Sequence, residues 1–322
     1  MVRGLAGGYP VARARLVAWW PDCVKVGAGV AKAVFTTAAG SVYDDLPEFR
    51  YHFPRTYLGA VRRAIGDWVV YYEPRRTEGP ASSAGRQAYF AVARITGVEP
   101  DSERSNHFYA FVRDYLEFDR AVPFREGERY YESVLRRPDG GTSKGAFGRS
   151  VRLLPEEEFR LIVQAGFAEA LRRWEAEQIG EAPAEYHRHP IHEQLVRRPF
   201  RDVAFRRHVR EAYDNRCAIT GLRLTNGGGR PEVQAAHIRP VAKEGPDSVR
   251  NGLALTSTVH WLFDRGLITI DDDHCVRLSG QGMPDGLERL LAGERSLVLP
   301  ERPELRPHPM FVRWHREHVF KP

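Results

Sequence analysis

The sequence predicts an α+β protein of two domains, and three observations support this prediction. Aromatic and apolar runs separated by turn residues occupy the first half of the 322-residue chain, as in a small curved sheet or barrel. A strand, a loop, a strand and a helix succeed one another over residues 234–264. Residues 176–200 lie between these parts and have no clear period, as in a linker. We therefore expect one domain over residues 1–175 and another over residues 201–322.

The elements of the N-terminal domain are predicted from apolar spacing and turn residues. Three strand-like runs rich in aromatic and β-branched residues cover residues 34–37, 67–72 and 88–95. Pro155 opens a helix in which Phe159, Ile162, Val163, Phe167 and Leu171 share one apolar face. This helix is expected to close the N-terminal domain.

The C-terminal domain is predicted to begin with a basic helix and to end with a packed tail. Residues 201–213 form the basic helix, and residues 239–250 are too rich in proline, glycine and charge to form an element. This loop is a candidate for DNA contacts. A helix ending at Asp264 is followed by Gly266, a good stop signal, and by a strand over residues 267–271. Residues 300–320 are expected to pack back onto this domain.

Three polar side chains are expected to converge in this domain. His237 closes the first strand, Asn251 ends the loop, and His260 lies on the helix. Phosphodiester hydrolysis needs a base for the attacking water, and a neutral histidine is suited to that task at cytoplasmic pH. Asn251 is the candidate for holding the imidazole or its backbone in place, because an amide is indifferent to pH. His237, Asn251 and His260 are therefore the predicted catalytic residues.

A metal site is predicted on the helix. His260 and Asp264 are one turn apart, so both side chains lie on one face and suit a single divalent ion, Mg²⁺ or Mn²⁺. A terminal carboxylate paired with Arg265 or Arg239 is the alternative interpretation of Asp264.

Residues 201–280 resemble an HNH endonuclease domain of the ββα-metal class. The resemblance lies in Cys-Ala-Ile-Thr-Gly at 217–221, Ala-His-Ile at 236–238, Asn-Gly-Leu-Ala-Leu at 251–255, His260 and Phe-Asp-Arg-Gly at 263–266. Such domains hydrolyse DNA with a histidine base and a divalent ion. Many of them carry two Cys-x-x-Cys pairs for zinc and an acidic or histidine ligand before the base. This chain has Thr220 and Ala236 at those places, so no structural zinc is expected and the metal shell must be completed otherwise.

The N-terminal half resembles PUA-superfamily domains of the EVE and SRA-like kind over residues 30–155. Tyr-x-Phe-Pro-x-x-Tyr at 51–57, Gly-Asp-Trp at 66–68 and Tyr-Tyr-Glu-Pro at 71–74 carry this resemblance. It implies a PUA-like β-barrel with flanking helices that reads modified bases, by stacking on aromatic rings and by bonding to carboxylates. Packing in the barrel core is the alternative for each aromatic residue. The candidate pocket comprises Tyr43, Asp44, Asp45, Tyr51, Phe53 and Trp68.

Composition bounds the partners and the compartment. The chain has 48 basic and 42 acidic residues and a formal charge of +6, a mild indication of a polyanionic partner. Three cysteines without a pairing pattern favour a reducing compartment, and no apolar run is long enough to span a membrane, so we expect a cytoplasmic protein without a membrane partner.

We conclude from the sequence that the chain is a modification-dependent DNA endonuclease of the type IV restriction kind, which recognises modified cytosine in double-stranded DNA and acts against phage DNA. Because one such site cuts one strand, we expect a homodimer. The alternatives are an HNH nuclease of a mobile element that binds unmodified nucleic acid, and a modified-base reader without activity.

Overall fold

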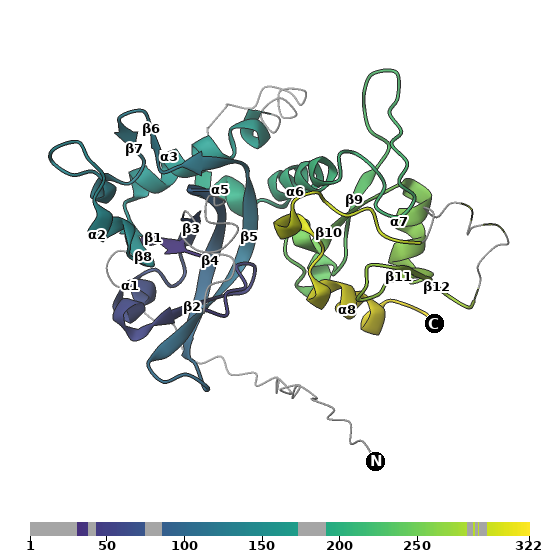
Figure 1. Cartoon of the computed structure of the whole chain (residues 1–322), viewed down its shortest axis with the longest axis horizontal. Coiled ribbons are helices and arrows are strands. Elements are labelled where there is room, and N and C mark those ends of the chain that lie inside the picture. The colour runs from purple at the N-terminus through teal and green to yellow at the C-terminus, as the bar shows by residue number, and fades with distance from the viewer. Residues whose placement is uncertain are drawn as a thin grey trace, which may run out of the picture.

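The computed structural model in Figure 1 describes residues 31–37, 43–74, 86–172, 191–281, 286, 289 and 295–322. Within these ranges, no helix has the length and apolar character needed to cross a bilayer. The N-terminal region contains β1 (Lys32–Thr36), β2 (Arg50–Pro54), α1 (Leu58–Arg63), β3 (Trp68–Glu73), β4 (Ala88–Pro100), β5 (His107–Pro123), β6 (Arg125–Glu126), β7 (Arg129–Tyr130), α2 (Lys144–Phe147), β8 (Val151–Leu154) and α3 (Glu156–Gly166). The C-terminal region contains α5 (Ile191–Val196), α6 (Arg198–Ala212), β9 (Gln234–His237), β10 (Gly252–Leu255), α7 (Ser257–Asp264), β11 (Ile268–Ile270), β12 (Val276–Leu278) and α8 (Pro309–His318).

The N-terminal region is built on a curled six-stranded sheet with the order β2-β5-β4-β3-β1-β8. Strands β1 and β3 are parallel, and all other neighbours are antiparallel. The sheet curls because β4 and β5 are long strands whose pairing shifts register three times, and each bulge bends a ladder. In the described part of the chain, β2 and β8 stay unpaired with each other, so the sheet is a half-barrel. The predicted curved sheet or barrel is thus present as a curled half-barrel, and PUA identity stays a prediction.

The strand and helix predictions in this region are confirmed in place. The runs at 34–37, 67–72 and 88–95 correspond to β1, β3 and the first part of β4. Helix α3 buries Phe159, Ile162 and Val163 as its spacing predicts, and these side chains pack under the sheet with Trp68 and Leu116. The apolar spacing was informative here because α3 has one buried and one charged face.

The C-terminal region has a small hairpin-like sheet with α7 beside it. In the antiparallel pair β9 and β10, His237 lies opposite Gly252. Helix α7 ends before Gly266, which has φ +71° and whose missing Cβ would meet the carbonyl oxygen of Val319 at 2.0 Å. Helix α8 buries Phe311 and Val312 in the same core, which confirms that the C-terminal segment packs back onto this domain.

Helix α6 contributes to the cores of both regions. Its residues Phe200 and Ala204 pack in the core that α3 and the sheet form, whereas Phe205 and Val209 pack with β9 and β10. Gly252 permits this approach, because a Cβ there would meet Cγ2 of Val209 at 2.4 Å. The described end of the predicted linker, residues 191–196, forms helix α5. The limits of the two domains stay a prediction.

Candidate active site

A cavity of about 440 Å³ lies between the end of β9 and helix α7. His237, His260 and Asp264 all line it, together with Arg198 and Ala235. Two strands and a helix that follow one another in the chain thus bring two imidazoles and a carboxylate to one cavity. Three of the four predicted catalytic and metal residues therefore lie together. The fourth, Asn251, is buried and does not line this cavity.

His237 is held on two sides. Its ring stacks on Phe205 of α6, with ring centroids 3.8 Å apart and an interplanar angle of 11°. Its Nε2 lies 3.0 Å from Oδ1 of Asp247, and the side chain keeps 18% of its surface exposed. Because an ionised carboxylate only accepts hydrogen bonds, Nε2 carries the proton and donates it to Asp247. Nδ1 of the neutral ring then has the free lone pair, so it is the atom that can accept a proton.

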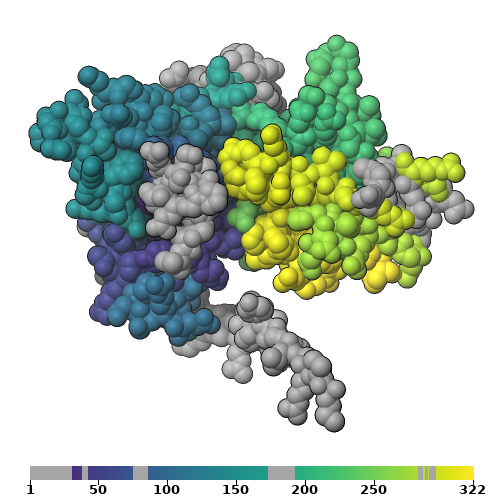
Figure 2. Space-filling model, viewed as in Figure 1, coloured from purple at the N-terminus to yellow at the C-terminus, as the bar shows by residue number. Residues whose placement is uncertain are grey.

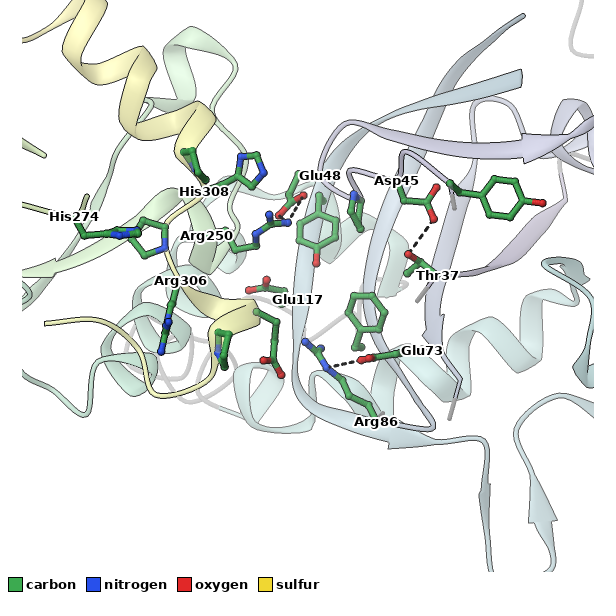
Figure 3. A pocket seen from close by; sticks show the side chains of 18 residues that line it. Thr37, Asp45, Glu48, Glu73, Arg86, Glu117, Arg250, His274, Arg306 and His308 are labelled. Atoms are coloured by element: carbon green, nitrogen blue, oxygen red, sulfur yellow. Dashed lines mark hydrogen bonds and ion pairs between the residues drawn. The ribbon is translucent and has the colours of Figure 1, made fainter. Parts of the chain in front are cut away.

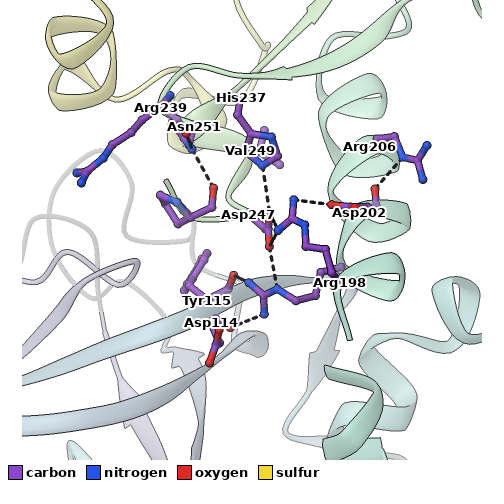
Figure 4. Close-up of polar contacts among 12 residues, drawn as sticks. Asp114, Tyr115, Arg198, Asp202, Arg206, His237, Arg239, Asp247, Val249 and Asn251 are labelled. Carbon is purple, nitrogen blue, oxygen red and sulfur yellow. Dashed lines mark hydrogen bonds and ion pairs between the residues drawn. The ribbon is translucent and has the colours of Figure 1, made fainter. Parts of the chain in front are cut away.

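Asp247 is a buried carboxylate between two arginines (Figure 4). Arg198 Nη1 donates to both of its oxygens at 2.9 Å, and Arg201 Nε donates to Oδ2 at 2.8 Å. Burial raises the pKa of Asp247, but the hydrogen bond from His237 and the charges of Arg201 and Arg198 outweigh burial and lower the pKa to about 2. Asp247 therefore stays ionised at neutral pH, and it fixes both the tautomer and the direction of His237.

Asn251 fastens the loop that joins β9 to β10. The fully buried side chain accepts from the backbone N–H of Arg239 at 2.9 Å and donates to the carbonyl oxygens of Arg239 and Pro246, each at 2.9 Å. These three bonds tie the two ends of the loop together directly after His237. Asn251 touches the backbone behind the histidine and not its ring, and the catalytic role of Asn251 stays a prediction.

His260 is oriented by Gln234 of β9. Oε1 of Gln234 lies 3.0 Å from Nδ1 of His260, and the amide nitrogen of Gln234 donates to Oγ of Ser257. The Nδ1 proton is thus engaged, and the lone pair of Nε2 points toward Oδ2 of Asp264, 3.4 Å away. A protonated ring would donate from Nε2 to this carboxylate, whereas a neutral ring with its proton on Nδ1 leaves the Nε2 lone pair and the carboxylate available to a shared cation.

The donor set at His260 and Asp264 therefore fits a divalent cation. Imidazole nitrogen and carboxylate oxygen are both ligands for first-row divalent ions, and Gln234 is the outer partner that such a histidine ligand requires. Ala236 packs in the core at 1% exposure, so no ligand comes from the position before His237. Among the residues that the structure describes, no three histidine, cysteine or acidic side chains form a ready cluster, so water and phosphate oxygens would complete the shell.

We expect His260→Ala and Asp264→Asn each to weaken metal binding by at least about 10- to 100-fold, the range typical when a metal ligand loses only its outer hydrogen-bond partner. Titration with Mn²⁺ followed by calorimetry measures this directly. Asp273→Asn, at an exposed turn, is the matched control and should bind Mn²⁺ like the unaltered chain. Unchanged Mn²⁺ affinity in the Asp264 variant would return that residue to a helix-terminal role.

The predicted base-pocket residues separate into two groups. Tyr43 and Asp45 line a second cavity, of about 450 Å³, between the two regions (Figure 3). Tyr51, Phe53 and Trp68 are at most 4% exposed, pack in the cores of the sheet and do not line this cavity, so their predicted place in a base pocket is wrong. Trp68 points toward the side of the sheet that α3 covers, and Tyr51 and Phe53 point into the core on the other side, which also contains Val61 of α1. Asp44 is exposed and pairs with Arg50 outside this cavity.

Asp45 has an unusual carboxyl group. Burial raises the pKa of Asp45 to about 6, although the backbone N–H of His52 and the Thr37 hydroxyl lower it in part. A carboxyl group whose folded pKa is raised stabilises the fold below its unfolded pKa, and this contribution is lost as pH rises from about 4 through 6.

The difference in free energy of unfolding, Asp45→Asn minus the unaltered chain, should therefore become more positive between pH 4 and pH 7, by at most roughly 3 kcal/mol. The reason is that only the unaltered chain loses stability as Asp45 ionises. Urea unfolding at the two pH values measures the difference. Asp44→Asn, at the exposed neighbour, should show no such gain. A constant difference between the Asp45 variant and the unaltered chain at both pH values would contradict the assigned pKa.

Sequence reasoning missed three residues of this site, namely Phe205, Gln234 and Asp247. Asp247 lies in the loop that composition assigned to DNA contacts, and an aspartate after proline is an ordinary turn residue. Gln234 lies three residues before His237, so the two side chains point to opposite faces of the strand, and only the position of α7 brings Gln234 to His260. Phe205 belongs to a helix outside the strand–loop–strand–helix unit, and only the fold brings its ring to His237.

A comparison with protein families finds a match for part of the C-terminal region. Residues 217–271 match the family model described as HNH endonuclease. Two solved structures are similar to the chain at 16% identity. A modification-dependent TagI restriction endonuclease has TM-score 0.28, with 88% of this chain and 81% of that chain covered. The type IV phosphorothioation-dependent restriction endonuclease ScoMcrA has TM-score 0.17, with 71% of this chain and 49% of that chain covered. No curated protein matches the chain significantly.

Proposed function

We propose that the chain is an HNH nuclease, as the match of residues 217–271 to the HNH endonuclease family model supports, and that it hydrolyses phosphodiester bonds in double-stranded DNA that carries modified cytosine. The observation that carries the nuclease part is the convergence of His237, His260 and Asp264 on one cavity, with Asp247 behind His237. These residues supply a base, its orienting partner and two ligands for an ion.

The proposed mechanism assigns one task to each side chain. Nδ1 of His237 takes the proton of the attacking water, and the anionic Asp247 stabilises the imidazolium that results. Asn251 keeps the loop closed so that the histidine does not turn away. His260 and Asp264 would hold Mg²⁺ or Mn²⁺, which when bound neutralises charge on the phosphate and on the leaving oxygen.

A path for the DNA backbone leads to this cavity. Arg206 and Arg210 of α6 and Arg230 of the following loop line a hollow that also contains His260. Three guanidinium groups that lead to a metal-ligand histidine suit the phosphates of a duplex. We therefore propose that the strand to be cut crosses the face formed by α6 and the 226–235 segment.

Replacing Arg206 and Arg210 together with alanine should weaken DNA binding for all sequences alike and reduce the slope of log Kd against log salt by about 2, one unit for each lost phosphate contact. Fluorescence anisotropy at several salt concentrations measures the slope. Arg137→Ala, on an exposed turn of the N-terminal region, is the control and should leave the slope unchanged. An unchanged slope in the double variant would place the DNA elsewhere.

Recognition of a modified base is proposed for the cavity between the two regions. Tyr43, Phe90 and Tyr115 give it aromatic walls, and Asp45 and Glu117 give it acceptors for an exocyclic amine. Its volume of about 450 Å³ lies in the range of ligand pockets. A flipped cytosine has the matching chemistry, with an aromatic ring that can stack and one exocyclic amine that can donate.

Restriction of modified phage DNA is the biological role we propose for such an enzyme. Each site supplies one base and one ion and so cuts one strand, which makes a homodimer the simplest route to a double-strand break. Analytical ultracentrifugation with and without modified duplex tests the dimer.

The specificity is tested by incubating the full chain with matched duplexes that carry cytosine, 5-methylcytosine, 5-hydroxymethylcytosine or glucosylated cytosine, with Mg²⁺ or Mn²⁺. Cleavage that depends on both the metal and the modification supports the proposal. Equal cleavage of all duplexes would instead favour a nuclease for unmodified DNA. Binding of modified DNA without cleavage under any ion would favour an inactive reader.

A further inference from the structure

Two carboxylates face the cavity between the regions and come from the N-terminal sheet and the loop before it. Glu48 and Glu117 both line this cavity, and Arg250 and residues 303–309 close it from the C-terminal side (Figure 3). The C-terminal segment lies directly against the N-terminal region on the face that Figure 2 shows. A ligand in the cavity would therefore touch both regions.

The same carboxylates hold a loop of the nuclease domain. Glu48, whose side chain is 1% exposed, accepts from Nη1 of Arg250 at 3.1 and 3.3 Å and from Oγ of Ser248 at 3.2 Å. Glu117 accepts from the backbone N–H of Val249 at 3.1 Å, and its Oε1 lies 3.4 Å from Oγ of Ser248, which shares its one hydroxyl proton between the two glutamates. Residues 248–250 are thus docked on side chains that also form the cavity wall.

The docked segment lies between two residues of the nuclease site. Asp247 precedes it and receives the Nε2 proton of His237, and Asn251 follows it and closes the loop. A second link exists through Arg201, which donates to Asp247 and also to the carbonyl oxygens of Asp114 and Tyr115 on β5. A continuous set of hydrogen bonds therefore runs from the cavity wall to the ring of His237.

We infer that Glu48 and Glu117 are positioning residues through which an occupant of the cavity controls the nuclease. This inference rests on the proposed function, since the occupant is the flipped modified cytosine. Each carboxylate has acceptor capacity left after its bonds to the loop, so an amine donor can bind without displacing Ser248. The occupant also excludes water, which strengthens the remaining bonds to residues 248–250. The docked loop, and with it the alignment of Asp247 and His237, is stabilised by the correct base.

Ser248→Ala tests this inference, because Ser248 is buried, bonds to both carboxylates and does not line the cavity. The test compares the variant with the unaltered full chain on modified and unmodified duplexes and measures Kd and the single-turnover cleavage rate separately. We expect the unaltered chain to prefer modified DNA in both quantities. The variant should keep the preference in Kd and lose most of the preference in rate, by about 5- to 150-fold, the usual size of coupling between two sites.

Two controls separate transmission from a loss of structure. Ser248→Thr retains the hydroxyl and should restore the preference in rate, and Ser279→Ala removes another buried hydroxyl of the same domain and should have no effect on it. A preference in rate that survives Ser248→Ala overturns the inference alone. Equal rates and equal Kd values for both duplexes in the unaltered chain overturn the proposed specificity first, and the inference with it.

A measurement on the unaltered chain gives an independent answer. The Cε1–H signal of His237, assigned by its loss in His237→Gln, should shift when 5-methyl-2′-deoxycytidine saturates the cavity, because the bonds to Asp247 change. Signals of Tyr43 and Tyr115 in the same spectra report saturation. An unchanged His237 signal at saturation would overturn the inference.

Discussion

Replacing His237 with alanine should lower the rate of DNA cleavage by about 10²- to 10⁴-fold, the contribution of a well-placed general base. The ring acts on the attacking water and takes no part in holding the duplex, so the Kd for DNA should stay within about threefold. Single-turnover cleavage and anisotropy at fixed salt measure the two quantities. The change also removes the ring that stacks on Phe205, so the melting temperature should be recorded for each variant.

His318→Ala is the matched control for this experiment, since it removes an exposed histidine of α8 that stacks on Trp314 outside the cavity. Cleavage by this control should be normal. Equal losses of binding and of cleavage in the His237 variant would mean that the histidine holds DNA and is not the base.

Asp247→Asn should have the second largest effect. The amide can still accept one hydrogen bond from an arginine, but it no longer offers His237 a charged acceptor, so the imidazole loses its fixed tautomer and the imidazolium loses its counter-charge. We expect cleavage to fall by about 10²- to 10⁴-fold, with Kd for DNA little changed. The buried Arg201 loses its carboxylate partner, which should also destabilise the fold by about 3–5 kcal/mol if the pair behaves like other buried ion pairs that lose one partner, whereas the half-exposed Arg198 keeps Asp202.

The stability loss does not confound the measurement if cleavage is assayed well below the melting temperature of the variant. Asp202→Asn provides the comparison, because Asp202 pairs with the same Arg198 but does not touch His237. It should cleave at nearly the normal rate. A cleavage rate in Asp247→Asn that matches the Asp202 control would show that His237 needs no charged partner.

Local pattern predicted the strand–loop–strand–helix unit, because every signal in it is carried by neighbours in the chain. The strand before His237, the turn after Asp264 and the apolar face of α3 all follow from spacing and from turn residues. Convergence of His237 and His260 on one cavity also follows from these local elements.

Contacts between distant segments were beyond such reasoning. Phe205 reaches His237 only because α6 lies against β9, and Asp247 is fixed by Arg198 and Arg201 of the same helix. The aromatic residues of the sheet show that local sequence can also suggest a site where the fold forms a core. Tyr51 and Phe53 have the composition of a stacking pocket, but which face of a strand is buried depends on the curl of the whole sheet.

Helix α6 has a consequence for how the protein unfolds and for how it can be rebuilt. Helix α6, with fifteen residues, supplies hydrophobic side chains to two cores, so both cores lose part of their packing when the helix unfolds. The two regions should therefore unfold in a single cooperative transition and not in two independent ones. For the same reason, an exchange of N-terminal regions between relatives should place the junction after Ala212, so that α6 is transferred whole with its sheet. The core of the recipient nuclease would then have to be redesigned to pack against the Phe205 and Val209 side of the transferred helix.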